Sequence, residues 1–267
     1  MASSEIGRGA GGGRDVRVGL IVPSSNVTME RELPAILGRR RAIAPEAFSF
    51  HSSRVRMRSV TPEALAAMNG QATRAAQELA DASVDVVVYA CLVALMAEGP
   101  GAHRRAEAAL EATLAAEGAP APVVSSAGAL VDTLRELDAR RIALIAPYLP
   151  DLTRRVCDYV AAEGVAVAAA HSLAVADNGA VGNLDPWRLL EIADRLPRDV
   201  DAVVLSACVQ MPSLAVIDAA EARLGRPVLS SATATVYQTL RRLGLPPLAP
   251  GAGRLLTGAL GVLEVRG

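Results

Sequence analysis

The sequence predicts an α/β fold of two pseudo-symmetric lobes, each a parallel sheet flanked by helices, with the functional site in the cleft between them. Three segments recur in the same order in the two halves of the chain. The copies in the first half are RVGLIVP (17–23), VDVVVYAC (84–91) and PVVSSAGALVDTL (122–134). The copies in the second half are RIALIAP (141–147), VDAVVLSAC (200–208) and PVLSSATATVYQTL (227–240). Each copy begins as a short apolar run, typical of strands buried on both faces, and helical patterns separate the copies.

The duplication also predicts where the chain divides. Residues 1–15 are rich in glycine, and we expect a disordered tail there. We expect the first α/β repeat lobe at 16–135 and the second at 136–241. The remaining segment, 242–267, reads as part turn and part apolar element, and we expect it to pack on the first lobe.

The connections between the predicted strands have helical patterns. Residues 61–83 open with an N-cap threonine, a proline at the first helical position and a first-turn acid. Residues 101–118 are rich in alanine, glutamate and arginine and end at a glycine, and 186–196 and 212–225 are similar. Strands that alternate with helices indicate βαβ units with right-handed crossovers.

Composition excludes several classes of partner. The chain has 267 residues, 51% of them hydrophobic, which is enough for a sizeable core. A formal net charge of −1 gives no electrostatic footprint for nucleic acid or an anionic membrane. No apolar run approaches the roughly 18 to 20 residues that span a bilayer, and the first residues lack the apolar region of a secretory signal. We therefore expect a cytoplasmic protein with neither a nucleic-acid partner nor a membrane partner.

Composition also excludes several kinds of chemistry. All 27 basic residues are arginine, which excludes a Schiff-base lysine and a P-loop lysine. The three histidines have no metal-ligand spacing, so no metal site is expected. The three cysteines are too few, and odd in number, for a disulfide framework. We expect free thiols, with Cys157 packed within a helical segment.

Two of these cysteines occupy equivalent positions of the repeat. Ligands of open parallel sheets bind outside the carboxyl ends of the strands, and Cys91 and Cys208 end corresponding strands of the two halves. A lone buried cysteine usually acts as a small hydrophobe, but this paired placement favours a two-thiol site on opposite walls of one cleft. A helix that begins just after the strand is expected to lower the thiol pKa below about 8.5.

Other strand ends supply polar candidates. Asn26 follows the first strand, and Tyr148 follows the strand that opens the second half. Asn178 reads by pattern alone as part of an Asn-Gly turn. Paired serines after several strands can donate hydrogen bonds or simply cap helices. They are Ser24, Ser25, Ser125, Ser126, Ser230 and Ser231.

Three arginines alternate along one short segment. Arg54, Arg56 and Arg58 can clamp a carboxylate through a guanidinium group, or they can lie on a solvated loop or an edge strand. The residues alone leave both interpretations open.

Five stretches together resemble the maleate cis-trans isomerase family, within the aspartate/glutamate racemase superfamily. They are VGLIVPSSNVTME (18–30), FHSSRVRMRSVTPEAL (50–65), YACLVA (89–94), ADNGAVGNLDP (176–186) and SACVQMPSL (206–214). The resemblance covers about 17–245. It implies an enzyme that uses no cofactor and no metal, acts on a small dicarboxylate and is a homodimer or another homo-oligomer.

The resemblance also implies roles for single residues. Cys91 adds as a thiolate to one alkene carbon of maleate, the former double bond rotates, and expulsion of the thiol gives fumarate; Cys208 handles the proton opposite. The substrate-binding residues implied are Asn26, Tyr148, Asn178, Pro23, Val93 and Val209.

Three alternative functions remain. The first is a cofactor-independent racemase of an amino acid or hydantoin with two cysteines as acid and base, and the CNT and GCTH motifs that would support it are absent. The second is a related decarboxylase of the arylmalonate type, against which Cys91 argues. The third is a ligand-binding module without catalysis, which would carry an export signal.

Overall fold

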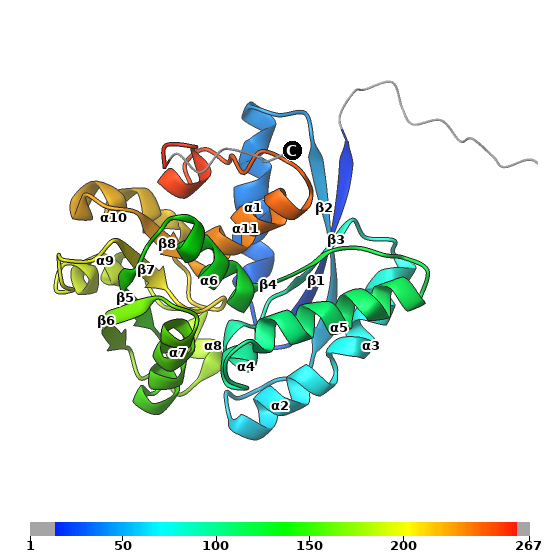
Figure 1. Cartoon of the computed structure of the whole chain (residues 1–267), viewed down its shortest axis with the longest axis horizontal. Helices are drawn as coiled ribbons and strands as arrows, with labels where there is room; N and C mark the ends of the chain where they lie inside the picture. Colours follow the sequence, from blue (N-terminus) through cyan, green and yellow to red (C-terminus); the bar gives the residue numbers. More distant parts are fainter. Residues whose placement is uncertain (1–13, 261–267) are drawn as a thin grey trace, which may run out of the picture.

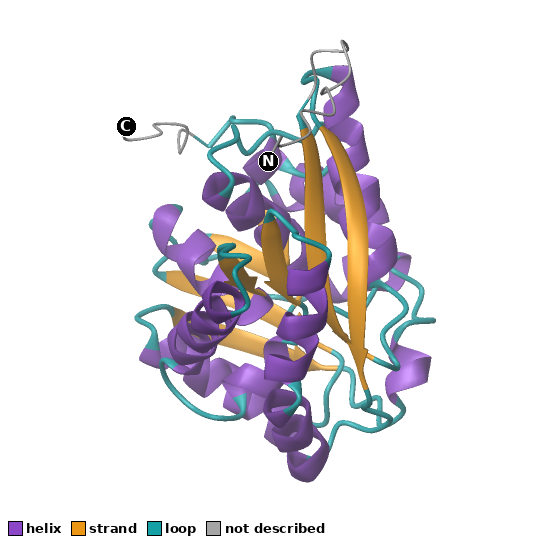
Figure 2. Ribbon diagram, turned by 90° about the vertical axis from the view of Figure 1, so that its right-hand side faces the viewer, coloured by secondary structure: helices purple, strands orange, loops and turns teal. Residues whose placement is uncertain are grey.

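A computed structural model describes residues 14–260, and the strands in it form two four-stranded parallel sheets (Figures 1 and 2). The first sheet has the order β2-β1-β3-β4, with β1 Asp15–Pro23, β2 Ala47–Val55, β3 Val86–Tyr89 and β4 Val123–Ser125. The second has the order β6-β5-β7-β8, with β5 Arg141–Ala146, β6 Ala166–Ser172, β7 Ala202–Ser206 and β8 Val228–Ser230. The two orders are the same when each half is counted from its own first strand, which confirms the predicted duplicated α/β fold.

Helices cover both sheets. Those of the first half are α1 Met29–Arg39, η1 Arg40–Ala42, α2 Pro62–Gly70, α3 Ala72–Asp81, α4 Leu92–Met96, α5 Ala102–Ala116 and α6 Ser126–Glu136. Those of the second half are α7 Pro150–Ala162, α8 Asn178–Val181, α9 Trp187–Ala193, η2 Leu214–Val216, α10 Ile217–Leu224, α11 Ser231–Arg242 and η3 Arg254–Leu256.

Two predicted helices differ from the structure. The pattern at 61–83 is two helices, α2 and α3, which meet at Gln71 directly after Gly70, a poor residue for a helix interior. The predicted N-cap is present, because the Thr61 side chain accepts a hydrogen bond from the Ala64 amide. The pattern at 212–225 becomes an α-helix only at Ile217, because a 3₁₀ turn comes first.

The central strands are the most buried. All four residues of β3 and all five of β7 are buried, as expected for strands covered on both faces. By contrast β2 lies at the edge of its sheet and is half-exposed. The arginine-rich segment therefore belongs to an edge strand and the turn that follows it.

The two halves share a layer of helices. Helix α11 of the second half packs against α6 of the first, and it also contacts α1, β3 and β4 (Figure 1). The Thr235 hydroxyl donates to Ser126 Oγ at 3.1 Å, and Gln238 Nε2 donates to Thr133 Oγ1 at 3.2 Å. This layer joins the two halves of the chain.

The described part of the C-terminal segment contacts both halves. Arg40, fully buried, donates to the carbonyls of Pro246 at 2.5 Å and Leu248 at 2.7 Å, while η3 packs on α11 and β8. The boundaries 16–135 and 136–241 stay a prediction, and the tail predicted at 1–15 falls almost wholly outside the described residues.

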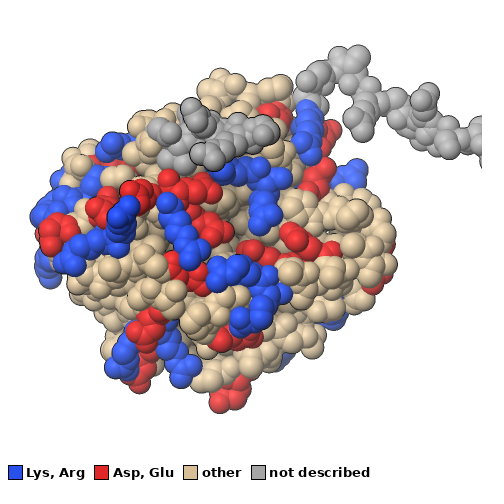
Figure 3. All heavy atoms as spheres, viewed as in Figure 1, with Lys and Arg blue, Asp and Glu red and all other residues tan. Residues whose placement is uncertain are grey.

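Surface charge is mixed. On the face shown in Figure 3, arginines and carboxylates are interspersed. Among residues 14–260, no helix combines the length and apolar character that crossing a membrane requires.

Candidate active site

The structure places Cys91 and Cys208 at equivalent points. Cys91 follows β3 by two residues and is the N-cap of α4, and Cys208 follows β7 by two residues. Their exposed fractions are 3% and 6%. A negative charge on Cys208 would raise the pKa of Cys91, so the two thiols are close enough to interact. The third cysteine, Cys157, is half-buried on α7.

Both site thiols are protonated at neutral pH. Burial, with a smaller effect of Cys208, raises the pKa of Cys91 to about 12, while a backbone hydrogen bond from Ala94 opposes the shift. The expected lowering by a helix N-terminus is wrong for this thiol, because α4 has only five residues and desolvation outweighs its dipole. Burial also raises the pKa of Cys208.

Cys208 has more hydrogen bonds than Cys91. Its sulfur accepts from the Gln210 amide at 3.3 Å, and hydrogen bonds from Tyr148 and the Met211 amide also lower its pKa against the effect of burial. Since these donors favour the thiolate, the two cysteines are chemically unequal.

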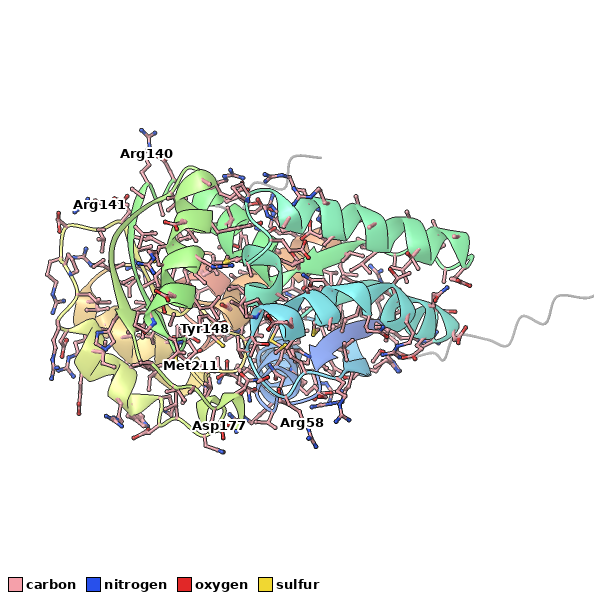
Figure 4. All side chains as sticks on the ribbon, turned by 90° about the horizontal axis from the view of Figure 1, so that it is seen from below. Arg58, Arg140, Arg141, Tyr148, Asp177 and Met211 are labelled. Carbon is pink, nitrogen blue, oxygen red and sulfur yellow. The ribbon has the colours of Figure 1, made fainter. Side chains whose placement is uncertain are left out.

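Tyr148 lies beside Cys208. Its side chain is buried, and Figure 4 shows it in the interior with Met211, whereas Arg58 and Arg140 lie at the outer edge. Burial and the neighbouring Cys208 raise the pKa of Tyr148 well above its ordinary range. The phenol therefore stays protonated and acts as a hydrogen-bond donor.

Asn26 connects the two halves. Its Oδ1 accepts from the amides of Thr28 at 3.0 Å and Met29 at 2.9 Å, and its Nδ2 donates to the Val209 carbonyl at 3.2 Å. The side chain is 1% exposed. Among residues 14–260, the second Nδ2 hydrogen has no acceptor, so it is available to a ligand.

Asn178 occupies a short helix where the pattern predicted a turn. Asp177 caps α8 by accepting from the amides of Gly179 at 2.7 Å and Ala180 at 3.1 Å. Asn178 is buried, and its Nδ2 donates to Ser25 Oγ at 2.7 Å. The cap directs the asparagine toward the loop that carries Asn26.

A small enclosed cavity lies between these loops. Its volume is about 60 Å³, and Tyr148 and Asn178 supply its polar side chains. The apolar residues that line it are Val60, Leu149, Leu152, Val175, Ala176 and Val181. An outer groove of about 380 Å³ shares Val60, Leu149 and Leu152 with it, so these three form the wall toward solvent.

The remaining predicted pocket residues lie on the same loops. Pro23 ends β1, Val93 is in the first turn of α4, and Val209 follows Cys208. Val93 and Val209 are 4% and 6% exposed. The structure thus brings the predicted set to one region at the carboxyl ends of the strands.

The arginines support the site from outside. Arg54 donates to the carbonyls of Ser24 at 3.0 Å and Asn26 at 2.7 Å and pairs with Glu30, so it holds the Asn26 loop. Arg56 and Arg58 are exposed. The serines differ in role too. Ser125 and Ser230 cap α6 and α11, and Ser25 binds Asn178.

The described residues include no group of three histidine, cysteine, aspartate or glutamate side chains placed to hold a metal ion. A larger open depression, of about 500 Å³, lies between α1, residues 182–186 and residues 212–215. None of the predicted site residues lines it.

The chain is similar to known proteins over nearly its whole described length. The family model described as arylmalonate decarboxylase matches residues 18–256. The chain is 54% identical over 244 residues to a maleate isomerase of Alcaligenes faecalis, covering 91% of this chain and 96% of that protein. It superimposes on the maleate isomerase Iso of Pseudomonas putida S16 with a TM-score of 0.91 at 50% identity, covering 92% of this chain and 100% of that one.

A second solved structure carries chemical information. It is a cysteine-to-serine variant of the Nocardia farcinica maleate cis-trans isomerase with a covalently bound succinylcysteine intermediate. Its TM-score is 0.87 at 51% identity, covering 91% of this chain and 98% of that one. With the family model spanning nearly all the described residues and relatives this similar over their whole length, the chain belongs to the maleate isomerase family.

Proposed function

We propose that this protein is a cofactor-independent cis-trans isomerase that converts maleate to fumarate through a succinyl-cysteine intermediate. The observation that carries the proposal is the pair of buried thiols, Cys91 and Cys208, at equivalent strand ends with Tyr148 on one of them. The relative from Nocardia farcinica with its succinylcysteine supports the covalent route.

Cys91 is the proposed nucleophile. Its S–H proton passes to a carboxylate oxygen of the bound maleate as the sulfur electron pair forms a bond to one alkene carbon. The π electrons move to the other carbon, where the adjacent carboxylate delocalises them, and the proton returns to the sulfur when Cys91 is expelled. The link between the two carbons is then a single bond and rotates. Expulsion of the thiolate restores the double bond in the trans isomer.

Cys208 is the proposed acid. Because its pKa is raised, it holds a proton at neutral pH and can deliver it to the carbon opposite Cys91, then remove it before the thiolate leaves. The hydrogen bonds from Tyr148 and from the Gln210 amide stabilise the Cys208 thiolate left between these two steps.

Ionising Cys91 is the costly part of this scheme. A pKa of about 12 places the free thiolate about 7 kcal/mol above the thiol at pH 7. That cost falls if the proton leaves as the carbon–sulfur bond forms, since the negative charge then moves to the substrate.

Neutral donors hold the substrate in this proposal. Asn26, Asn178 and Tyr148 bind the carboxylates, the single Tyr148 hydroxyl hydrogen turning to Cys208 while that sulfur is a thiolate. Pro23, Val93 and Val209 line the pocket. The apolar wall of the cavity excludes water, which strengthens these hydrogen bonds.

The racemase alternative needs two thiols that exchange the roles of acid and base. The unequal hydrogen bonding of Cys91 and Cys208 favours one nucleophile and one acid instead.

We further propose that the enzyme works in the cytoplasm, because a reducing compartment suits its free thiols. We also propose that the enzyme is a homo-oligomer, which light scattering after size exclusion would test.

Proton NMR of maleate incubated with purified protein and EDTA tests the function. We expect the maleate signal to fall and the fumarate signal to rise, with no conversion by Cys91→Ser. No conversion by the wild type, together with solvent deuterium exchange into an amino acid, would establish the racemase instead.

A further inference from the structure

Gln210 has a buried polar side chain beside the candidate site. It lies two residues after Cys208 and is 3% exposed. Its Oε1 accepts from the Val27 amide at 2.8 Å, and its Nε2 donates to the carbonyls of Ser25 at 2.9 Å and Asn178 at 3.0 Å. Every hydrogen of the side-chain amide is therefore used.

The main chain of Gln210 makes two more contacts. Its N–H donates to Cys208 Sγ at 3.3 Å, and its carbonyl accepts from Thr28 Oγ1 at 2.7 Å. One residue thus touches the acid thiol and both loops that carry the substrate asparagines. The two loops are 153 residues apart in sequence, counted from Ser25 to Asn178, and besides Gln210 the hydrogen bond between these two side chains joins them.

Gly182 leaves space for the side-chain amide of Gln210. A Cβ placed on Gly182 would lie 2.9 Å from Gln210 Nε2 and 2.6 Å from Val27 Cγ2. The backbone of Gly182 is in the ordinary helical region, with φ −67°, so its conformation alone does not call for glycine. The room beside Gln210 is what the missing side chain provides.

We propose that Gln210 is the positioning residue of the active site, which sets the distance between the Asn26 loop and the Asn178 loop and holds its own N–H against the sulfur of Cys208. The inference rests on the proposed isomerase function. Both asparagine loops and the acid thiol are hydrogen-bonded to this one residue. A displacement of about 1 Å in such a set can cost about 100-fold in rate.

Two substitutions perturb it differently. Gln210→Met keeps the length of the side chain and removes its three hydrogen bonds, and Gly182→Ala pushes on the amide from outside. The matched control is Gln238→Met, on α11, which removes the bonds of another buried glutamine to Thr133 and Glu136, both 3.2 Å long.

Two readouts are used. The first is kcat and KM for maleate. The second is the pH midpoint of iodoacetamide alkylation at each cysteine, read by mass spectrometry after trypsin. Cleavage after arginine places Cys91, Cys157 and Cys208 in the separate peptides 75–104, 156–188 and 199–223.

We expect Gln210→Met and Gly182→Ala to lower kcat by about 10-fold to 100-fold. The alkylation midpoint of Cys208 should rise by about half a unit to one unit, with that of Cys157 unchanged. Gln238→Met should lower the melting temperature about as much as Gln210→Met and leave kcat and the Cys208 midpoint at wild-type values.

A Gln210→Met enzyme with wild-type kcat and an unmoved Cys208 midpoint would overturn the proposal. An equal loss of kcat in Gln238→Met would overturn it too, because the effect would then be one of general stability. If Gln210→Met does not fold, Gly182→Ala decides by the same two readouts. If the wild type fails to isomerise maleate, the alkylation midpoints still decide the role of Gln210.

Discussion

Glu163→Gln is expected to weaken the contact between the two halves of the protein. Glu163 directly follows α7 as its C-cap and is 3% exposed, and its carboxylate accepts from the Gly101 amide at 3.0 Å. It also accepts from Arg104 on α5 at 2.8 and 2.9 Å, and from Arg135 on α6 at 2.8 Å. This second-half residue therefore holds two helices of the first half.

The expected loss of stability follows from the pKa of Glu163. Hydrogen bonds from Arg104 are the largest cause that lowers the pKa of Glu163 from 4.5 to about 2. That shift corresponds to about 3 kcal/mol. Because the side chains of Arg104 and Arg135 are 55% and 45% exposed, solvent screening reduces the expected loss to about 2 kcal/mol. A chain of this size should lose about 4–8 °C of melting temperature.

The pH dependence has a definite sign. The folded-state pKa lies below the unfolded value, so the stabilisation is fully present above pH 4.5 and is lost as the pH falls toward 2. Urea unfolding of wild type and Glu163→Gln should therefore differ most at neutral pH and converge in acid. Asp138→Asn is the control, because its 3.0 Å pair with Arg140 is exposed and should change stability by less than about 0.5 kcal/mol. If Glu163→Gln lowers the free energy of unfolding no more than Asp138→Asn does, or by the same amount from neutral pH to acid, the ionised Glu163 does not stabilise the fold.

Three further predictions concern the site. With a pKa of about 12, Cys91 should be alkylated by iodoacetamide at pH 8 about 1000-fold more slowly than a thiol with the ordinary pKa of 9.0; an equal rate would show that the free enzyme already ionises it. Tyr148→Phe removes the hydroxyl that favours the Cys208 thiolate, so the Cys208 alkylation midpoint should rise and kcat should fall by about 10-fold; an unchanged midpoint would contradict the contact. Ser25→Ala removes the 2.7 Å acceptor of Asn178 Nδ2, so KM for maleate should rise by about 5-fold with a smaller change in kcat, and a wild-type KM would show that Ser25 does not position Asn178.

The repeats predicted the fold because a parallel sheet leaves a local signature. Fully buried strands such as β3 and β7 read as apolar runs, and two copies of the same run imply two copies of the same pairing. Helix breaks were harder to predict. The junction of α2 and α3 at Gln71 has no proline and only one glycine beside it, so the pattern continues across it.

The positions of Cys91, Cys208, Asn26 and Tyr148 were predictable because each follows a strand, while their roles stay a prediction. Asn178 does not follow a strand directly; its orientation comes from the Asp177 cap and a contact to Ser25 from the other half.

Two properties of the site depend on the assembled fold. The raised pKa of Cys91 is a consequence of burial by both halves, which the local helix start does not reveal. The partners of the Gln210 side chain come from two loops that are distant from it in sequence, so no local pattern predicts them.

The identity of the nucleophile is the central claim, and trapping the covalent intermediate tests it most directly. Cys208→Ser and Cys91→Ser are each incubated with maleate, quenched in acid, digested with trypsin and analysed by mass spectrometry. We expect a succinyl adduct on peptide 75–104 of Cys208→Ser, at Cys91, and none on Cys91→Ser. An unmodified Cys208→Ser protein, together with an adduct on peptide 199–223 of Cys91→Ser, would reverse the roles of the two thiols.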